Sequence, residues 1–147
     1  MNNKVILLVE DNPHDQDLTL LALKKHNIAN EVEIANNGEE ALELLFGHGP
    51  TSFEARNITP MVVLLDLKLP KVDGHEVLRQ IRNTEATKTL PVVILTSSDE
   101  ENDLIESYSL GCNSYVSKPV EFDTFVEATR LMGLYWFLVN EPPLTPH

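Results

Sequence analysis

Short aliphatic runs recur along the chain, and segments with apolar residues at helical spacing follow them. Most of the runs are apolar at consecutive positions, which is typical of strands buried on both faces of a parallel sheet. The predicted strands are Lys4–Val9, Glu31–Ala35, Val62–Leu65, Pro91–Thr96 and Asn113–Lys118. The predicted helices are Asp15–Lys25, Glu39–Phe46, His75–Asn83, Asp99–Leu110 and Glu121–Asn140. This alternation predicts an α/β fold with a doubly wound parallel sheet, helices on both faces and right-handed crossovers.

Two stretches depart from this regular alternation. Gly47–Pro60 is rich in Gly, Pro, Thr, Ser and Asn and is longer than most connections between a helix and a strand, so we predict an exposed loop or extension there. The last helix, Glu121–Asn140, is stopped by Glu141-Pro142-Pro143 and followed by a short tail. A length of 147 residues predicts a single domain that spans positions 1–147.

Charge and cysteine content exclude several classes of protein. The formal net charge is −12, which argues against binding a nucleic-acid backbone or an anionic membrane, because both require basic patches. Cys112 is the single cysteine, so no disulfide can form within the chain, as expected in a reducing compartment. The apolar run at the N-terminus is too short for a signal peptide or a membrane span. We therefore expect a cytoplasmic protein.

Polar and charged residues stand where the predicted strands end. Because parallel strands end at one edge of a sheet, we expect these side chains on one side of the domain. The residues are Glu10, Asp11, Asp66, Thr96 and Lys118. The three carboxylates would repel one another unless a hard divalent cation lay between them, and Mg²⁺ fits best because it binds a few carboxylates and keeps waters. The hydroxyl and the ammonium could hold phosphoryl oxygens, with a carboxylate as the nucleophile that forms an acyl phosphate.

Other chemistries find no support in the sequence. A Gly-rich phosphate loop is absent, so the site is not built for a nucleotide. The five histidines are scattered without the spacing of metal ligands, which argues against zinc or non-haem iron.

The motifs resemble those of CheY-like response-regulator receiver domains, in the order that this family shows and over nearly the whole chain. They are Glu10-Asp11, Asp66-Leu67-Lys68-Leu69-Pro70 with Asp73-Gly74, Thr96, and Lys118-Pro119. The resemblance implies a flavodoxin-like (βα)5 fold with strand order 2-1-3-4-5. It also implies a phosphoacceptor signalling domain, which takes a phosphoryl group from a sensor histidine kinase and catalyses only its own phosphorylation and dephosphorylation.

The same resemblance implies a role for each metal-binding residue. Asp11 and Asp66 would bind Mg²⁺ directly, together with the backbone carbonyl of Lys68. Glu10, where the family often has Asp, would act through a water molecule. Asp66 would be the residue converted to 4-aspartylphosphate.

The remaining motif residues are expected to sense the phosphoryl group. Thr96 and Lys118 would contact its oxygens. Tyr115 occupies the position of the family's switch aromatic residue and would rotate inward when Thr96 moves toward the phosphoryl group.

The extension and the tail narrow the resemblance. Gly47–Pro60 and Tyr135–Pro143 are similar to the corresponding parts of small single-domain regulators that work with cyanobacterial and other bacterial phytochromes. This implies a phytochrome-type sensor histidine kinase as partner. Output would pass by protein–protein contact or by phosphorelay to a downstream histidine phosphotransfer protein. The helix Glu121–Asn140 is apolar around most of its circumference, which predicts a homodimer through its outward face. The alternative is that the Gly47–Pro60 extension or the Pro142–His147 tail folds back and covers that face.

Two alternative functions remain open at this stage. A small phosphatase-like hydrolase with an aspartyl-phosphate intermediate would need a cap domain and a second acid just after the nucleophile, and position 68 is Lys. An adaptor that works without phosphorylation would leave the complete set of motif residues unexplained.

Overall fold

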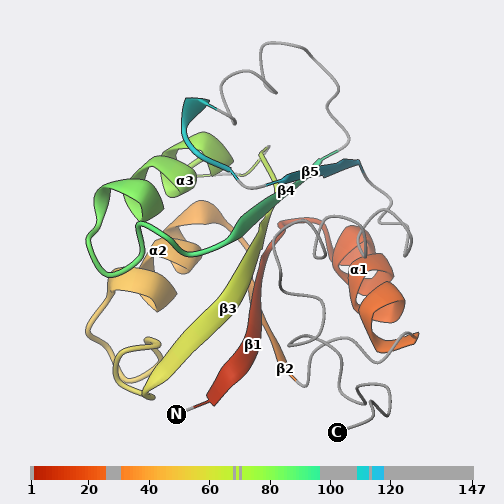
Figure 1. Ribbon diagram of the computed structural model, residues 1–147. Helices are drawn as coiled ribbons and strands as arrows, with labels where there is room; N and C mark the ends of the chain where they lie inside the picture. The colour runs from red at the N-terminus through yellow and green to blue at the C-terminus, as the bar shows by residue number, and fades with distance from the viewer. Residues whose placement is uncertain are drawn as a thin grey trace, which may run out of the picture.

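The computed structural model describes residues 2–25, 31–67, 69, 71–96, 109–112 and 114–117. Within these residues, five strands form one parallel sheet in the order β2-β1-β3-β4-β5 (Figure 1). The strands are β1 (Asn2–Val9), β2 (Glu31–Ala35), β3 (Ile58–Leu65), β4 (Val92–Thr96) and β5 (Ser114–Ser117). The predicted flavodoxin-like sheet with strand order 2-1-3-4-5 is confirmed.

Helices cover both faces of the sheet, as predicted (Figure 1). They are α1 (Pro13–Lys25), α2 (Gly38–Phe46) and α3 (Gly74–Asn83). Successive residues of a strand point to opposite faces, so β1 contributes to two separate cores. Leu7 and Val9 pack in the core beneath α2 and α3, whereas Ile6 and Leu8 pack with Leu23 of α1. Both faces of the strands are therefore buried, which explains their unbroken aliphatic runs.

Side-chain caps set the start of each of these helices. Asn12 Oδ1 accepts hydrogen bonds from the backbone N–H groups of His14 and Asp15, at 2.8 and 3.2 Å. Asn37 caps α2 and Asp73 caps α3 in the same way, each through the N–H three residues later. The three helices therefore begin one or two residues earlier than predicted.

The segment 47–57, which connects α2 to β3, corrects one prediction. Most of its side chains are exposed, as predicted, but Ser52 and Phe53 are buried, with Phe53 only 3 % exposed. The N–H of Phe53 donates to the carbonyl of Leu44 in α2, and the N–H of Ile58 donates to the carbonyl of Phe53, both at 2.9 Å. The strand β3 begins at Ile58, inside the predicted loop. The segment is thus a folded part of the domain, anchored by one aromatic side chain.

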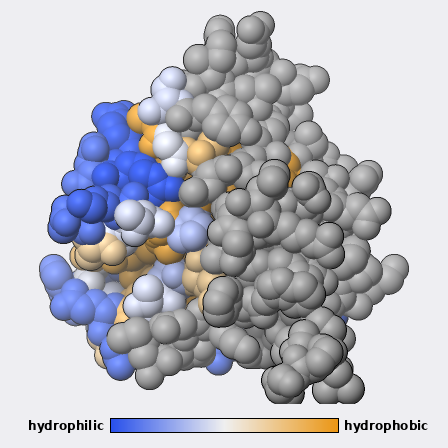
Figure 2. Space-filling view, viewed as in Figure 1, coloured by the Kyte–Doolittle hydropathy of each residue, from blue (hydrophilic) through white to orange (hydrophobic). Residues whose placement is uncertain are grey.

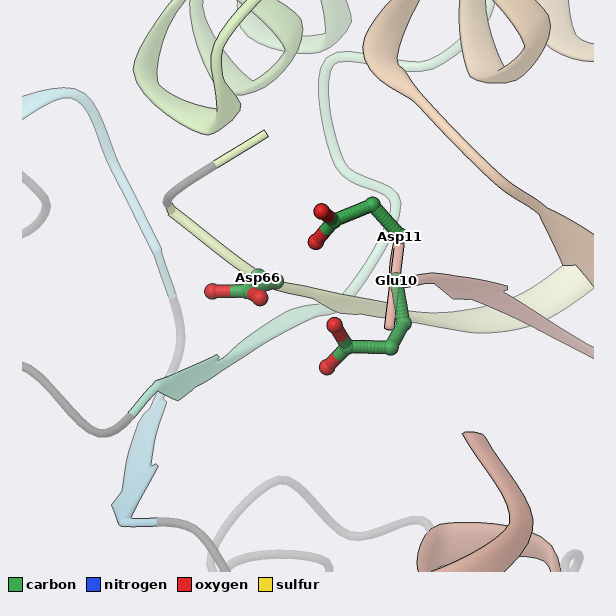
Figure 3. A group of neighbouring side chains, drawn as sticks. All are labelled: Glu10, Asp11 and Asp66. Atoms are coloured by element: carbon green, nitrogen blue, oxygen red, sulfur yellow. The ribbon is translucent and has the colours of Figure 1, made fainter. Parts of the chain in front are cut away.

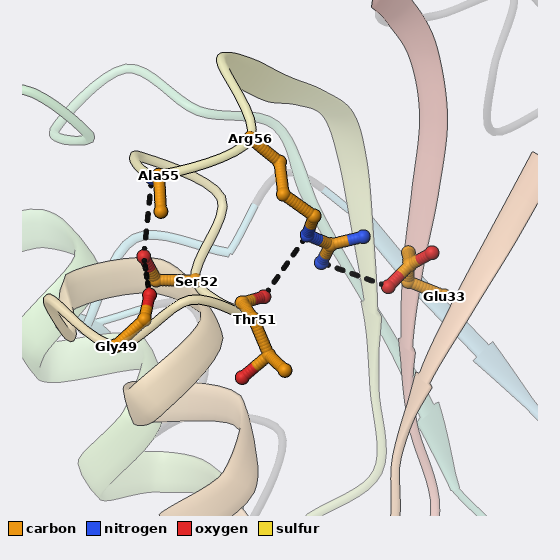
Figure 4. A network of polar contacts seen from close by, with 6 residues as sticks. All are labelled: Glu33, Gly49, Thr51, Ser52, Ala55 and Arg56. Atoms are coloured by element: carbon orange, nitrogen blue, oxygen red, sulfur yellow. Dashed lines mark hydrogen bonds and ion pairs between the residues drawn. The ribbon is translucent and has the colours of Figure 1, made fainter.

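Polar contacts hold segment 47–57 together and tie it to β2 (Figure 4). Ser52 Oγ donates to the carbonyl of Gly49 at 2.8 Å and accepts the N–H of Ala55 at 3.2 Å. Arg56 lies over the ring of Phe53, 5.5 Å from its centroid, and its Nε donates to the carbonyl of Thr51 at 3.0 Å. Its Nη2 forms an ion pair with Glu33 Oε1 of β2 at 3.0 Å.

Arg82, near the end of α3, connects two loops at the sheet edge where β4 and β5 begin. Its Nε donates to the carbonyl of Gly111 at 2.8 Å and its Nη1 to the carbonyl of Leu90 at 2.7 Å. Burial lowers the pKa of the Arg82 guanidinium, while Cys112 acts in the opposite direction. Gly111 has φ +95°, the left-handed conformation expected of a glycine just past a helix end.

Several predictions concern residues that the structure does not describe. Apart from Ser109 and Leu110, the predicted helix Asp99–Leu110 lies outside the described residues, and so does the helix Glu121–Asn140 with its tail. Of the helices that are described, none has the length and apolarity to cross a membrane.

Candidate functional site

Three carboxylates meet at the edge of the sheet where β1 and β3 end (Figure 3). Glu10 and Asp11 follow β1 directly, and Asp66 follows β3. One carboxylate oxygen from each of the three side chains lies within 4.8 Å of an oxygen of the other two. Glu10 and Asp66 are 2 % and 4 % exposed, whereas Asp11 is exposed. The predicted convergence of these three acids is confirmed.

Backbone hydrogen bonds extend the sheet by one residue past β1 and β3, and so fix the backbone positions of two of the acids. The N–H of Glu10 donates to the carbonyl of Ala35 in β2, and the N–H of Asp66 donates to the carbonyl of Val9 in β1, both at 3.0 Å. Because β1 and β3 are neighbours in the sheet, the two acids lie side by side at the same level along the strand direction. The parallel pairing of β1 and β3 therefore brings together carboxylates that are far apart in the chain.

The turn from β1 into α1 holds Glu10 through further contacts. The N–H of Asn12 donates to Glu10 Oε2 at 3.2 Å. Gln16, one turn into α1, donates from Nε2 to the backbone carbonyl of Glu10 at 2.6 Å and to Asn36 Oδ1 at 2.8 Å. Pro13 is the first residue of α1, a position that suits its fixed φ and its missing N–H, so the helix starts directly after the acids.

The loop from β3 into α3 depends on a glycine at the start of the helix. A Cβ on Gly74 would clash with the carbonyl oxygen of Asp66 and lie 2.7 Å from Cα of Leu67. The N–H of Gly74 donates to the carbonyl of Leu67 at 3.1 Å. Lys71, between them, has φ +68°, which is an uncommon conformation for a residue with a side chain. The backbone at Asp66 is therefore packed closely against the beginning of α3.

We expect Gly74→Ala to destabilise the domain, because the new methyl group would meet backbone atoms that no side-chain rotation can move. Overpacking of this kind costs about 2 kcal/mol. Chemical denaturation would measure the loss. Gly49→Ala is the matched control, because a Cβ there meets Glu43 Oε1 at an ordinary 3.5 Å. Equal stability of the two variants would contradict the close approach at Gly74.

The other predicted site residues are described only in part. Thr96 is the last residue of β4 and pairs with Ser117, and Tyr115 pairs with Ile94, so both positions lie in the strands as predicted. Thr96 ends its strand at the same edge of the sheet as the acidic cluster. Lys68 and Lys118 lie outside the described residues.

The chemistry of the acidic cluster fits a hard divalent cation. Three carboxylates so close together repel one another, and two of them have little contact with water. A cation that prefers oxygen ligands would relieve that repulsion. Within the described part of the chain, no other group of three His, Cys, Asp or Glu side chains could hold a metal.

The chain matches the response regulator receiver domain family over residues 6–130. The chain therefore belongs to the response regulator receiver family, and this membership accounts for its sheet order and its acidic cluster. Receiver domains are signalling domains of two-component systems.

Two curated relatives cover most of the chain. The probable methanogenesis regulatory protein FilR2 of Methanothrix harundinacea is 40 % identical over 139 residues, which is 95 % of this chain and 87 % of that protein. The response regulator Rcp1 of Synechocystis is 38 % identical over 133 residues, which is 90 % of this chain and 88 % of that protein.

Solved structures extend the comparison to phytochrome response regulators. The bacteriophytochrome response regulator AtBRR is 51 % identical with a TM-score of 0.83, covering 96 % of this chain and 100 % of that one. The phosphorylated cyanobacterial phytochrome response regulator RcpA is 35 % identical with a TM-score of 0.73, covering 99 % and 100 %. The Mn²⁺-bound form of Rcp1 is 38 % identical with a TM-score of 0.72, covering 97 % and 99 %. The chain therefore has phytochrome response regulators among its homologues.

Proposed function

We propose that this receiver domain takes a phosphoryl group from a sensor histidine kinase onto Asp66, in a reaction that requires Mg²⁺. The observation that carries the proposal is the meeting of three carboxylates within 4.8 Å at the end of β1 and β3. Asp66 is the member that comes from β3, at the centre of the sheet, beside the end of β4 that carries Thr96. A phosphoryl group on Asp66 would thus stand next to a hydroxyl-bearing strand end.

Each acid has a separate part in the proposed metal site. Asp11 and Asp66 bind Mg²⁺ directly, together with the backbone carbonyl of Lys68, and Glu10 acts through a water molecule. The hydrogen bond that Glu10 Oε2 already accepts from the N–H of Asn12 supports this division, because it occupies one oxygen of that carboxylate. Mg²⁺ suits such a site, since it binds few carboxylates and retains waters. When bound, it would neutralise the charge that accumulates between the carboxylates and the incoming phosphoryl group.

The proposed reaction is an in-line transfer between two protein side chains. A carboxylate oxygen of Asp66 attacks phosphorus, the bond from phosphorus to the kinase histidine nitrogen breaks, and that nitrogen keeps the electron pair. Thr96 and Lys118 hold the phosphoryl oxygens. Water later attacks phosphorus, which releases inorganic phosphate and returns Asp66 to a carboxylate. The chain catalyses only these two steps on itself.

The proposed switch couples the phosphoryl group to a surface of β4 and β5. Thr96 moves toward the phosphoryl oxygens, and Tyr115 rotates toward the space that Thr96 leaves. The register supports this coupling, because Thr96 pairs with Ser117, two residues beyond Tyr115 on the neighbouring strand.

The proposed partners follow from the relatives and from the charge. AtBRR is a bacteriophytochrome response regulator and RcpA is a cyanobacterial phytochrome response regulator, and we infer that a phytochrome-type kinase phosphorylates this chain. Output passes by protein–protein contact or by relay to a histidine phosphotransfer protein. The chain also forms a homodimer through the outward face of the helix Glu121–Asn140. A net charge of −12 supports a role without nucleic acid or membrane binding. The single cysteine supports a cytoplasmic location, because that compartment is reducing. Residues 1–147 form one receiver domain in this proposal.

The decisive experiment labels the purified chain and locates the phosphate. The chain is incubated with Mg²⁺ and either acetyl phosphate, a phytochrome-type histidine kinase or an unrelated histidine kinase, and the product is mapped by peptide mass spectrometry. We expect one phosphate on Asp66, absent after Mg²⁺ is chelated, and faster transfer from the phytochrome-type kinase. Labelling at another residue would overturn the assignment of Asp66, and equal rates from both kinases would overturn the assignment of the partner.

A further inference from the structure

Residues 36–38, which form the turn after β2 and the first residue of α2, contact both of the turns that carry the acids. They contribute no carboxylate to the cluster itself. One end of this segment reaches the turn after β1 through Gln16, and the other end packs against the loop after β3. The two contacts come from residues that are nearly adjacent in the chain, so the two acidic turns share one support.

Gln16 makes the first contact with both hydrogens of its side-chain amide. Nε2 donates to the backbone carbonyl of Glu10 at 2.6 Å and to Asn36 Oδ1 at 2.8 Å. Asn36 is itself held, because its backbone N and its Nδ2 both donate to Glu40 Oε1, at 3.1 and 3.2 Å. The carbonyl of Glu10 belongs to the peptide that joins Glu10 to Asp11. Fixing this peptide therefore fixes the directions in which both acids leave the backbone.

Gly38 makes the second contact through the lack of a side chain. A Cβ at this position would clash with the carbonyl oxygen of Val72 and lie 2.9 Å from the Cβ of Val72. The start of α2 thus rests directly on the backbone of the loop that leads from Asp66 to Gly74. Asn37 keeps the start of α2 in place by accepting the N–H of Glu40 at 2.8 Å.

We propose that Gln16 and Gly38 are positioning residues, which set the separation of Glu10 and Asp11 from Asp66 and thereby the affinity for the metal. The inference rests on the proposed function, because it concerns the same metal site. Mg²⁺ requires near-octahedral geometry at short oxygen distances, so small displacements of the acids weaken binding strongly. Removing groups that hold metal ligands in place weakens affinity by about 10- to 100-fold in other proteins.

The first test replaces Gln16 by Met, which keeps the length of the side chain and removes both donors. Mn²⁺ affinity is measured by electron paramagnetic resonance of the free ion, on protein that circular dichroism shows to be fully folded. We expect Gln16→Met to bind Mn²⁺ about tenfold more weakly than wild type. Gln80→Met is the matched control, because Gln80 donates to Glu76 Oε2 on α3, away from the acids, and its affinity should stay unchanged.

The second test uses Gly38→Ala with Gly49→Ala as its control, because only the alanine at 38 meets backbone atoms. Gly38→Ala should weaken Mn²⁺ binding, and if it does not fold, Gln16→Met decides alone. A purely structural role would lower the unfolding midpoint and leave the affinity of the folded protein unchanged, and that result would overturn the inference. If wild-type protein bound no Mn²⁺, the proposed metal site would be overturned as well. If Asp66→Asn lost labelling but Gln16→Met bound Mn²⁺ normally, only the positioning role would be overturned.

Discussion

Asp66→Asn should fold normally and take up no phosphoryl group from acetyl phosphate or from a histidine kinase. The two side chains have the same shape, but an amide has no anionic oxygen that could attack phosphorus. Labelling followed by mass measurement would show the loss. Asp17→Asn is the matched control, since Asp17 is exposed on α1 and lies outside the acidic cluster, and it should be labelled at the wild-type rate. If Asp66→Asn were labelled as fast as wild type, the nucleophile would be another residue.

The same variant should respond differently to metal. In wild type, Mg²⁺ at a hundredfold excess over its dissociation constant should raise the free energy of unfolding by about 2.7 kcal/mol, because it binds only the folded state. Asp66→Asn removes one of three charges that lie within 4.8 Å of one another, so the metal-free protein should be more stable than wild type. Its gain from Mg²⁺ should be smaller, since one anionic ligand is lost. Thermal unfolding in EDTA and in Mg²⁺ would measure both effects, and an equal Mg²⁺ gain in both proteins would contradict the role of Asp66 as a ligand.

The acidic cluster could be predicted from the sequence because it depends on topology alone. Aliphatic runs marked the strands, alternation with helices made the sheet parallel, and parallel strands end at one edge. This reasoning alone predicts that the carboxylates of Glu10, Asp11 and Asp66 are neighbours, and the structure confirms their proximity. No tertiary detail was needed beyond the order of the strands.

The burial of individual side chains was harder to predict. In α1, the helical spacing of Leu18, Leu21 and Ala22 predicts that these residues form the apolar face, although Leu20 and Leu23 are apolar as well. The structure leaves Leu18 and Leu21 exposed, at 38 % and 63 %, and buries Thr19 and Leu23 instead. Packing against the sheet determines which face of α1 is buried, because the hydrophobic periodicity of this helix is too weak to determine it.

Contacts between distant parts of the chain left no local signal. Gln16 is a single polar residue on a helix, and its partner Asn36 is 20 positions away. Phe53 is one aromatic residue within a stretch rich in Gly, Pro, Ser and Thr, where no hydrophobic period exists to indicate burial. Gly38 resembled an ordinary turn residue, and only the packing of Val72 against it shows why a side chain is excluded.

Phe53→Ala should be among the most destabilising single substitutions in segment 47–57. The ring is 3 % exposed and belongs to the core beneath α2 and α3, together with Val63 and Ile81. Truncating a buried Phe to Ala typically lowers the free energy of unfolding by about 3–5 kcal/mol, and here the Arg56 guanidinium would also lose the ring beneath it. Urea denaturation would measure the change.

The effect should be confined to stability, because Phe53 and the acidic cluster lie at opposite ends of β3. The strand runs from Ile58 to Leu65, and the rise of about 3.3 Å from each residue to the next separates its two ends by about 23 Å. Under conditions where the variant stays folded, Asp66 should therefore be labelled at the wild-type rate. Leu21→Ala is the control, because that side chain is 63 % exposed and its loss should change stability by no more than about 0.5 kcal/mol. If Phe53→Ala and Leu21→Ala lowered the free energy of unfolding by equally small amounts, segment 47–57 would be an independent loop rather than part of the core.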